Sequence, residues 1–330
     1  MKIADKNFKV LDTFDSIVTI PDCFVVRKNK LGKGNGEAKL YFGTKTLMRE
    51  FFGDRGFEVK CFILKNDLIT FLNALKQEYT HPSLNYCGKD VLAQLWEDRM
   101  RKVELLEDII YFNVKDQTQI EGPRGYVNSK DKAYSILREL SLPLVSYIAA
   151  MKVKNSSNEI EFYWKLFVDF DAISEIKNGA LVFKYGKKEK DLISSIPKSK
   201  QQKSEDIRKA RVGQGKYREL LLEECPFCPI TMVNDERLLI ASHIKPWAFS
   251  NDKEKIDPKN GFMLTPLYDK LFDRGFITFT EDKHMLISDW LSPKNKRRLQ
   301  LKDNSYFQHL PIDDARLKYL RYHQELVFKG

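Results

Sequence analysis

The sequence lacks long hydrophobic runs and contains few cysteines. No stretch approaches the roughly 18 consecutive apolar residues that a membrane-spanning helix needs. The first residues, Met1–Lys6, lead into mixed sequence and not into the apolar region of a signal peptide. The 5 cysteines are an odd number in a chain of 330 residues, which argues against a disulfide framework. We therefore expect a soluble, cytoplasmic protein with no membrane partner.

Acidic residues are fewer than basic ones, and the basic excess is concentrated in one segment. The formal net charge is +10 at pH 7, which points to a polyanionic partner. Residues 187–218 contain eleven Lys or Arg and four Asp or Glu. This segment is either a solvated linker or a surface that follows nucleic-acid phosphates, since neutralising phosphates releases counterions. Charge alone does not separate these two interpretations.

The length allows two domains, and 42% hydrophobic residues with 22 phenylalanines can build cores for both. Residues 1–186 read as a mixed α/β domain. Residues 187–204 are polar, basic and poor in aromatics, which makes them the best candidate for a linker. Residues 205–330 form the remaining part, which ends in an amphipathic helix predicted over 313–328. The predicted fold class is α+β.

Three strands and two helices are predicted in the N-terminal part. Residues 160–170 alternate between apolar and polar side chains, which predicts a half-buried strand. The other predicted strands are 22–27 and 57–64, and the predicted helices are 66–79 and 90–111.

The chemically informative residues lie between positions 238 and 275. An apolar strand over 238–241 is expected to carry His243 at its end, and Asn260-Gly261 can return the chain into a second strand over 262–264. Pro266 then begins a helix on which Asp269 and Asp273 share one side, because they are four residues apart. The pattern predicts strand, loop, strand and helix, with the ionisable groups meeting at one end.

These residue types suit the hydrolysis of a phosphodiester. An imidazole titrates near neutral pH, so His243 can act as the base that deprotonates water. Asp269 and Asp273 supply hard oxygen ligands, which favour Mg²⁺ or Mn²⁺. Asn260 can hydrogen-bond backbone across the loop and hold the end of the histidine strand.

Several motifs recur in a fixed order. They are residues Arg211–Arg218, Cys228–Thr231, Ser242–Trp247, Asn260–Leu264 and Asp269–Gly275. In this order they resemble the HNH endonucleases of the ββα-metal superfamily, closest to the restriction-endonuclease-like branch, over about residues 205–285. The resemblance implies a ββα-metal nuclease domain. It also implies that His243 is the general base, Asn260 the structural asparagine, and Asp269 and Asp273 part of the metal-binding helix.

The chain departs from the commonest HNH pattern at two places. Ser242 stands where a metal ligand usually precedes the base, and Asp269 stands where a histidine is usual. Magnesium tolerates fewer protein ligands because it keeps several waters. Cys225 and Cys228 resemble half of a zinc site, but no second cysteine pair follows, so buried thiols and no structural zinc are expected.

Basic side chains around the motif are candidate DNA contacts, with a solvated surface as the alternative interpretation. The basic, glycine-rich loop 28–33 is either a segment that enters a DNA groove or an ordinary loop tip. The candidate DNA-binding residues near the motif are Gln214, Lys216, Arg218, Lys245 and Arg274.

The favoured hypothesis is a restriction-type, metal-dependent endonuclease of double-stranded DNA, in which residues 1–186 recognise the target. Cutting both strands with one active site per chain suggests a homodimer. A mobile-element or homing nuclease is a variant of this hypothesis. The alternative from another class is a nucleic-acid-binding protein whose HNH domain is inactive, which the serine at position 242 motivates.

Overall fold

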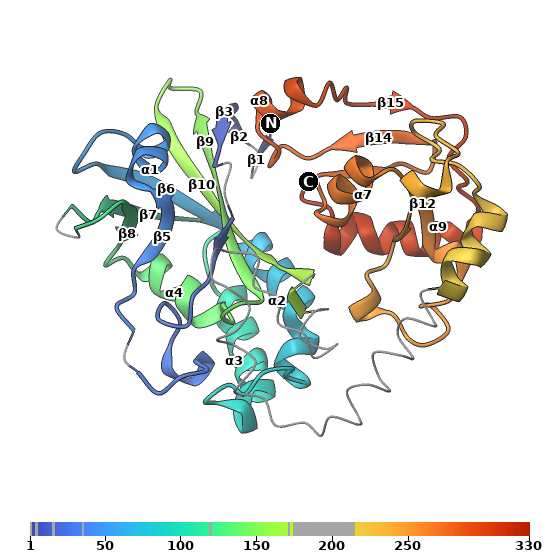
Figure 1. The fold of residues 1–330 in the computed structure, drawn as a ribbon. Coiled ribbons are helices and arrows are strands. Elements are labelled where there is room, and N and C mark those ends of the chain that lie inside the picture. The colour runs from blue at the N-terminus through green and yellow to red at the C-terminus, as the bar shows by residue number, and fades with distance from the viewer. Residues whose placement is uncertain are drawn as a thin grey trace. The chain divides into compact units, whose positions relative to one another are not determined.

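The computed structural model describes residues 2–3, 6–14, 17–34, 36–118, 121–170, 172–173 and 215–330. The chain divides into two compact units (Figure 1). The first comprises Met1–Asp169 with Asp289–Leu299, and the second comprises Phe170–Ser288 with Gln300–Gly330. The linker predicted over 187–204 lies outside the described residues. None of the described helices is long and apolar enough to cross a membrane.

The first unit is built on an eight-stranded sheet. Its neighbouring strands are antiparallel except β10 and β6, which run parallel with Phe162 opposite Cys61. The strand order is β3 (Lys9–Thr13), β9 (Ser146–Lys154), β10 (Ile160–Val168), β6 (Glu58–Leu64), β7 (Ile109–Asp116), β8 (Arg124–Asn128) and β5 (Leu40–Thr44), and β4 (Val18–Thr19) also pairs with β9. A separate pair joins β1 (Lys2–Ile3) and β2 (Lys6–Asn7).

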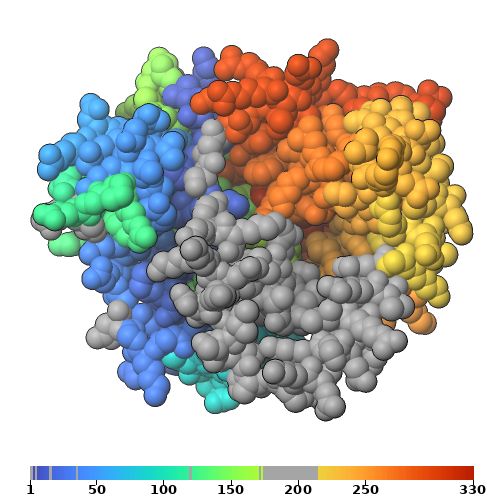
Figure 2. All heavy atoms as spheres, in the orientation of Figure 1, coloured from blue at the N-terminus to red at the C-terminus, as the bar shows by residue number. Residues whose placement is uncertain are grey.

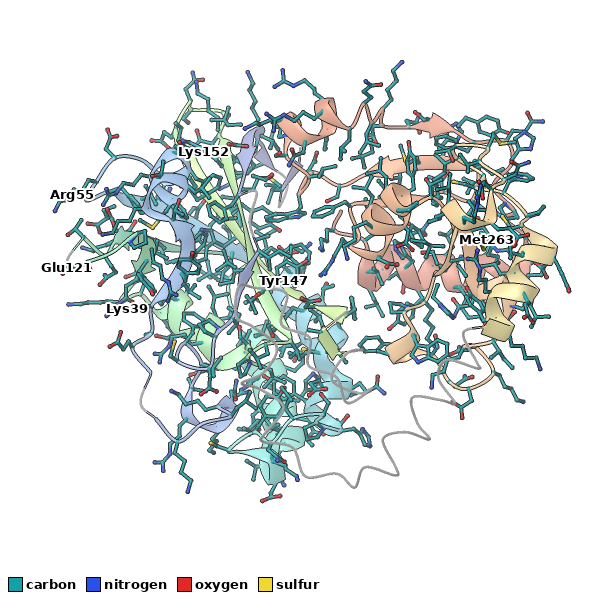
Figure 3. All side chains as sticks on the ribbon, in the orientation of Figure 1. Lys39, Arg55, Glu121, Tyr147, Lys152 and Met263 are labelled. Atoms are coloured by element: carbon teal, nitrogen blue, oxygen red, sulfur yellow. The ribbon has the colours of Figure 1, made fainter. Side chains whose placement is uncertain are left out.

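Aromatic side chains form much of the core of this sheet. Trp164 and Phe162 lie in a cluster of rings with Phe42 and Phe52, at centroid distances between 5.0 and 6.2 Å. Tyr147, labelled in Figure 3, stacks on Phe167 from the neighbouring strand β10. The helices of the first unit are α1 (Lys45–Phe52), α2 (Lys65–Thr80), α3 (Leu92–Glu104), α4 (Lys132–Leu140) and α8 (Pro293–Arg298).

The strand predicted over 57–64 and the helix predicted over 66–79 are confirmed as β6 and α2. The strand predicted over 22–27 is wrong. There the Phe24 N–H donates to the Pro21 carbonyl in a turn, and a 3-10 helix η1 (Arg27–Asn29) follows. Phe24 and Val25 are fully buried, so the apolar run reflected burial and not strand structure.

Two further predictions need correction. The helix predicted over 90–111 stops at Glu104, because strand β7 already begins at Ile109. The strand predicted over 160–170 exists as β10, but it is not half-buried. Glu161 is only 3% exposed, so the face that the alternation assigned to solvent is covered too. The Lys60 ammonium compensates the buried Glu161 carboxylate at 2.6 Å.

The second unit is smaller and contains the motif residues. A helix over 215–224 precedes the strand pair β11 (Ile240–His243) and β12 (Gly261–Leu264), and α7 (Pro266–Asp273) follows directly. Figure 2 shows these segments, in yellow and orange, packed with the red C-terminal elements of the same unit. The remaining elements are η4 (Glu236–Leu238), η5 (Trp247–Phe249), η6 (Pro258–Asn260), β13 (Ile277–Phe279), β14 (His284–Ile287), β15 (Ser305–Tyr306), α9 (Asp314–Tyr322) and a π-helical turn η7 (His323–Val327).

The predicted C-terminal helix is confirmed as α9 with η7, but of the leucines expected on its apolar face, Leu317, Leu320 and Leu326, only Leu320 is buried. Arg316, Leu320 and His323 are buried, at helical spacings of three and four. His323 stacks on Phe272 with a centroid distance of 3.8 Å. Its Nε2 donates to the Phe272 carbonyl, and its Nδ1 accepts from the Thr278 hydroxyl. The C-terminal turn is thereby fixed against α7 and β13.

Candidate active site

The two strands of the motif form a short antiparallel pair. His243 lies directly opposite Gly261, and Ser242 lies opposite Phe262. All four residues of β12 are buried, including Met263, which Figure 3 labels on this strand. The pair places the end of the histidine strand against the start of the strand that leads into α7. The loop of sixteen residues between the strands, 244–259, therefore begins and ends at nearly the same point of the fold.

Asn260 holds this loop closed from inside. Its side chain is fully buried, and its Oδ1 accepts from the Lys245 N–H at 2.8 Å. Its Nδ2 lies 3.1 Å from the Glu254 carbonyl and 3.3 Å from both the Lys245 carbonyl and the Ser250 hydroxyl. One amide group thus joins the beginning, middle and end of the loop. An unpaired backbone group here would cost about 1–3 kcal/mol, so these bonds strongly favour a single loop conformation.

The loop presents a carbonyl group to the histidine. The Nε2 of His243 lies 3.0 Å from the Lys255 carbonyl oxygen. A carbonyl only accepts, so Nε2 carries the hydrogen, and the neutral ring keeps its lone pair on Nδ1. Burial lowers the pKa of His243 to about 4, and the hydrogen bond to Lys255 opposes that shift only in part. At neutral pH the ring is therefore uncharged and able to accept a proton at Nδ1.

Two aromatic rings fix the plane of the imidazole. Tyr217 stacks on His243 with a centroid distance of 3.9 Å and an interplanar angle of 19°. Trp247 meets the same ring edge-on at 5.3 Å. With Nε2 bound by Lys255 and two aromatic rings in contact with the imidazole, the side chain has little freedom to rotate.

Gly261 is required by the same arrangement. A Cβ at this position would lie 1.8 Å from the Tyr217 hydroxyl oxygen, which donates to the Asn260 carbonyl at 3.0 Å. Its φ of −165° is ordinary extended backbone, so the requirement is for space and not for an unusual dihedral angle. Arg316 supports the other side of this turn, where its Nε donates to the Gly261 carbonyl and its Nη2 to the Pro258 carbonyl.

The two aspartates lie on α7 and face the same cavity as the histidine. Asp269 and Asp273 are half-buried and line a hollow of about 230 Å³ together with Ser242 and His243. The Ser242 hydroxyl donates to Asp273 Oδ1 at 3.4 Å. The structure therefore brings His243, Asp269 and Asp273 to one hollow, whereas Asn260 is not among its lining residues and lies at the end of the adjoining loop. Phe170, Trp247 and His323 also line this hollow.

The donors in this hollow suit a hydrated cation better than a fully protein-bound one. Across the described part of the chain, no group of three or more His, Cys, Asp or Glu is arranged to hold a metal ion. Two carboxylates and a serine hydroxyl are hard oxygen donors, and Mg²⁺ commonly binds one or two carboxylates and keeps its other ligands as water. A water occupies about 30 Å³, so the hollow has room for such an ion with several waters.

The candidate DNA contacts have different environments. Lys216 is exposed, whereas the Arg218 guanidinium donates to the Leu239 and Glu236 carbonyls. The Lys245 ammonium is 2.7 Å from the Glu254 carboxylate. Arg274 is half-buried after the last turn of α7. Gln214 lies outside the described residues, and a DNA-contact role for any of the five stays a prediction.

The two cysteines before the motif are buried and reduced. Burial raises the pKa of the Cys225 thiol, and the nearby Met263 backbone N–H opposes this in part. Cys228 is fully buried and donates its backbone N–H to the Val233 carbonyl. This environment favours thiols over thiolate ligands. The absence of a structural zinc stays a prediction.

Sequence reasoning missed the residues that orient the site from a distance. The Lys255 carbonyl left no signal, because any residue type supplies a backbone oxygen. Tyr217 belonged to the motif, but its stacking on His243 could not be derived from its position. Arg316 and His323 could have been found, because they share the helical face of Leu320 and polar residues on a buried face need partners.

A comparison with protein families agrees with the site. Residues 228–280 match the family described as HNH endonuclease, a segment that runs from Cys228 through β11, the loop, β12, α7 and β13. No curated protein matches the chain. The match supports a nuclease-type hydrolase at the level of the family, and the restriction-endonuclease-like branch stays a prediction. The C-terminal region of this chain contains an HNH endonuclease domain.

Proposed function

We propose that the chain is a metal-dependent endonuclease of double-stranded DNA, of the restriction type, with His243 as its general base. The observation that carries the proposal is the hydrogen bond from His243 Nε2 to the Lys255 carbonyl. That bond leaves Nδ1 as the basic atom of a half-buried histidine that lines the same hollow as Asp269 and Asp273. A general base in such a site contributes roughly 10²–10⁴-fold to the rate.

Each residue of the site has a separate role in the proposed hydrolysis. His243 Nδ1 takes a proton from a water molecule, and that water attacks the phosphorus of the scissile diester. Asn260 keeps the loop, and with it the Lys255 carbonyl, in place. Asp269 and Asp273 would hold Mg²⁺ or Mn²⁺, which when bound stabilises the developing negative charge and the leaving 3′ oxygen. Two copies acting on one target would cut both strands.

The test is cleavage of duplex DNA by the full chain with magnesium or manganese. Genomic DNAs of differing base modification are the substrates, since the target is unknown. Wild-type protein is compared with His243→Ala and with His309→Gln, which changes an exposed histidine that does not line the hollow. We expect products from wild type and His309→Gln and none above background from His243→Ala. Equal cleavage by His243→Ala and wild type would remove His243 from the mechanism.

A second candidate function is nucleic-acid binding by an inactive HNH domain. Ser242 favours it, because its hydroxyl is a weaker ligand than a carboxylate or imidazole, and here it donates to Asp273. This candidate predicts salt-sensitive DNA binding without turnover in either metal. Replacing Ser242 with Asp would then add a metal ligand. DNA cleavage by Ser242→Asp but not by wild type would support the inactive-domain candidate.

A further inference from the structure

Arg99, on α3 of the first unit, is a buried cation whose partners carry no negative charge. The residue is 6% exposed. Its Nη1 donates to the Tyr79 hydroxyl at 2.6 Å, and its Nη2 donates to Asn29 Oδ1 at 2.7 Å. Among the described residues, no carboxylate forms an ion pair with it. A guanidinium has five N–H donors, so these two bonds leave donors available.

Both partners of Arg99 are locked in the orientation that accepts its hydrogens. Tyr79 gives its own hydroxyl hydrogen to the Leu140 carbonyl, at 2.7 Å. Asn29 is fully buried, and its Nδ2 donates to the Glu139 and Ser141 carbonyls, so its Oδ1 must face the arginine. The guanidinium is therefore held in a fixed plane before any ligand arrives. Burying a charge without a counterion is costly, and a bound anion would offset that cost.

Arg99 borders a cavity of about 430 Å³ that is rich in positive charge. Both carboxylates that line this cavity already form ion pairs. Glu139 pairs with Lys102, which also lines the cavity, and Asp98 pairs with Arg101, which does not. The residues that line the cavity are Val26, Arg27, Lys28, Leu95, Asp98, Arg99, Lys102 and Glu139.

The segment that carries Arg27 and Lys28 is fixed to the rest of the unit by backbone bonds. The Lys28 carbonyl accepts from the Gly88 N–H at 2.7 Å, and the Lys30 carbonyl accepts from the Cys87 N–H. A Cβ at Gly88 would lie 2.6 Å from the Lys28 carbonyl oxygen, so this close approach needs glycine. The exposed side chains of Arg27 and Lys28 thus lie at the rim of a cavity whose inner cation is rigid.

We propose that this cavity of the first unit binds a phosphate group, held by the fixed guanidinium of Arg99 and by Lys28 at the rim. A guanidinium matches phosphate geometry with paired N–H donors, which a lysine does not. A backbone phosphate of the DNA substrate is the expected source, and this part rests on the proposed nuclease function. A free nucleotide offers the same chemical group, and the cavity volume lies within the range of small-ligand sites.

The first arm of the test uses inorganic phosphate and no DNA, so it is independent of nuclease activity. Thermal unfolding of the full chain is compared in phosphate and in chloride at equal ionic strength. Phosphate is expected to raise the Tm of wild type by about 2–4 °C, because it binds only the folded chain. Arg99→Gln should keep only the smaller rise that phosphate, as an excluded salt, gives any folded chain. It should also unfold in chloride at or above the wild-type temperature, since a buried uncompensated charge is gone. An equal phosphate effect in both proteins would overturn the proposal.

The second arm identifies the source of the phosphate. Binding of duplex DNA and of a deoxynucleoside monophosphate is measured with His243→Ala as background, so that DNA stays intact. Lys28→Ala and Arg99→Gln should each weaken duplex binding by about tenfold and lower its salt dependence by about one counterion. Lys130→Ala, an exposed lysine outside the cavity, is the control and should bind like its parent.

The outcomes of this arm are distinct. Weaker mononucleotide binding with unchanged duplex binding would keep the phosphate site and assign it to a free nucleotide, overturning DNA as the source. Unchanged binding of both probes in Arg99→Gln and Lys28→Ala would overturn the site itself. Neither result depends on whether wild type cuts DNA, so failure of the nuclease proposal is recognised separately.

Discussion

Each unit of the molecule contains a fully buried asparagine, and the two asparagines are used differently. The side chain of Asn260 in the second unit bonds to neutral groups, which are the backbone of the loop and the Ser250 hydroxyl. Asn29 in the first unit also donates to two carbonyls, but its oxygen accepts from the charged Arg99. The Asn260 network is closed and neutral, whereas the Asn29 network ends in a cation with unused donors.

This difference separates two ways to position a functional group. A closed network can fix a loop without any ligand present. The fixed loop then holds the Lys255 carbonyl, which determines the tautomer of His243. An open network positions a charge that only a ligand can compensate. We therefore propose that the second unit carries the chemistry and that the first unit recognises an anion.

The double variant Asp269→Asn, Asp273→Asn should show the largest effect on the second unit. Both changes keep side-chain size while replacing carboxylates with poorer ligands for Mg²⁺. We expect kcat for DNA cleavage to fall by about 10³-fold or more, with DNA affinity within about threefold of wild type. Single-turnover kinetics at saturating DNA and a magnesium titration measure this. Cleavage that persists at wild-type rate would show that the two aspartates do not serve the reaction.

Asn260→Ala and Asn29→Ala compare the two networks directly. Each removes several buried hydrogen bonds, so each should lower the free energy of unfolding by about 3 kcal/mol. Only Asn260→Ala should reduce kcat at saturating DNA, because the Lys255 carbonyl loses its support. Asn29→Ala should instead raise the Kd for DNA, since Arg99 loses an orienting acceptor. Urea unfolding and single-turnover cleavage are the measurements, and the same kcat loss in both variants would refute the division.

Gly261→Ala tests the close approach of Tyr217. The added Cβ would overlap the hydroxyl oxygen, so we expect a loss of about 2 kcal/mol of stability. Tyr217→Phe removes that oxygen and one hydrogen bond to Asn260, at a loss of about 1 kcal/mol. The double variant should lose less than the sum of the single losses, because the clash is relieved. Strict additivity in urea unfolding would argue against this contact.

Acid should destabilise the chain through two histidines whose pKa values are lowered in the folded state, the half-buried His243 and the buried His323. Burial lowers the pKa of His243 to about 4 and that of His323 to about 3, both from 6.5. Between pH 6.5 and about 4 the unfolded chain binds more protons than the folded one, so stability falls as pH falls. The slope should approach that of two protons, about 2.7 kcal/mol per pH unit. His323→Gln should reduce it by about one proton in urea unfolding across this range, and an unchanged slope would contradict the burial account.

The sequence was sufficient where a local pattern determines structure. Apolar runs, a turn pair and a proline predict strand β11, strand β12 and helix α7, and all three are present. The first strand is shifted, because β11 spans Ile240–His243 and not 238–241, where Leu238 ends the 3-10 helix η4. The same local reasoning failed at residues 22–27, where a buried apolar run forms turns held by distant backbone groups such as the Arg138 carbonyl. Burial and strand structure produce similar short runs of apolar residues, and only tertiary contacts separate them.

The geometry of the site was predictable only in part. Residue types and spacing indicated His243, Asn260 and the two aspartates, and the structure places them around one hollow or its supporting loop. The tautomer of His243 was not predictable, because it depends on a backbone oxygen twelve residues away. Arg99 left no signal either, since its burial depends on Tyr79 and Asn29, which are distant in sequence.

The most direct test of the central claim is ¹⁵N NMR of the His243 imidazole in the full chain, assigned by comparison with His243→Ala. The account predicts that at pH 7 the hydrogen is on Nε2, that Nδ1 is unprotonated, and that the ring stays neutral down to about pH 4. A hydrogen on Nδ1, or titration near the ordinary value of 6.5, would contradict the assignment of Nδ1 as the general base.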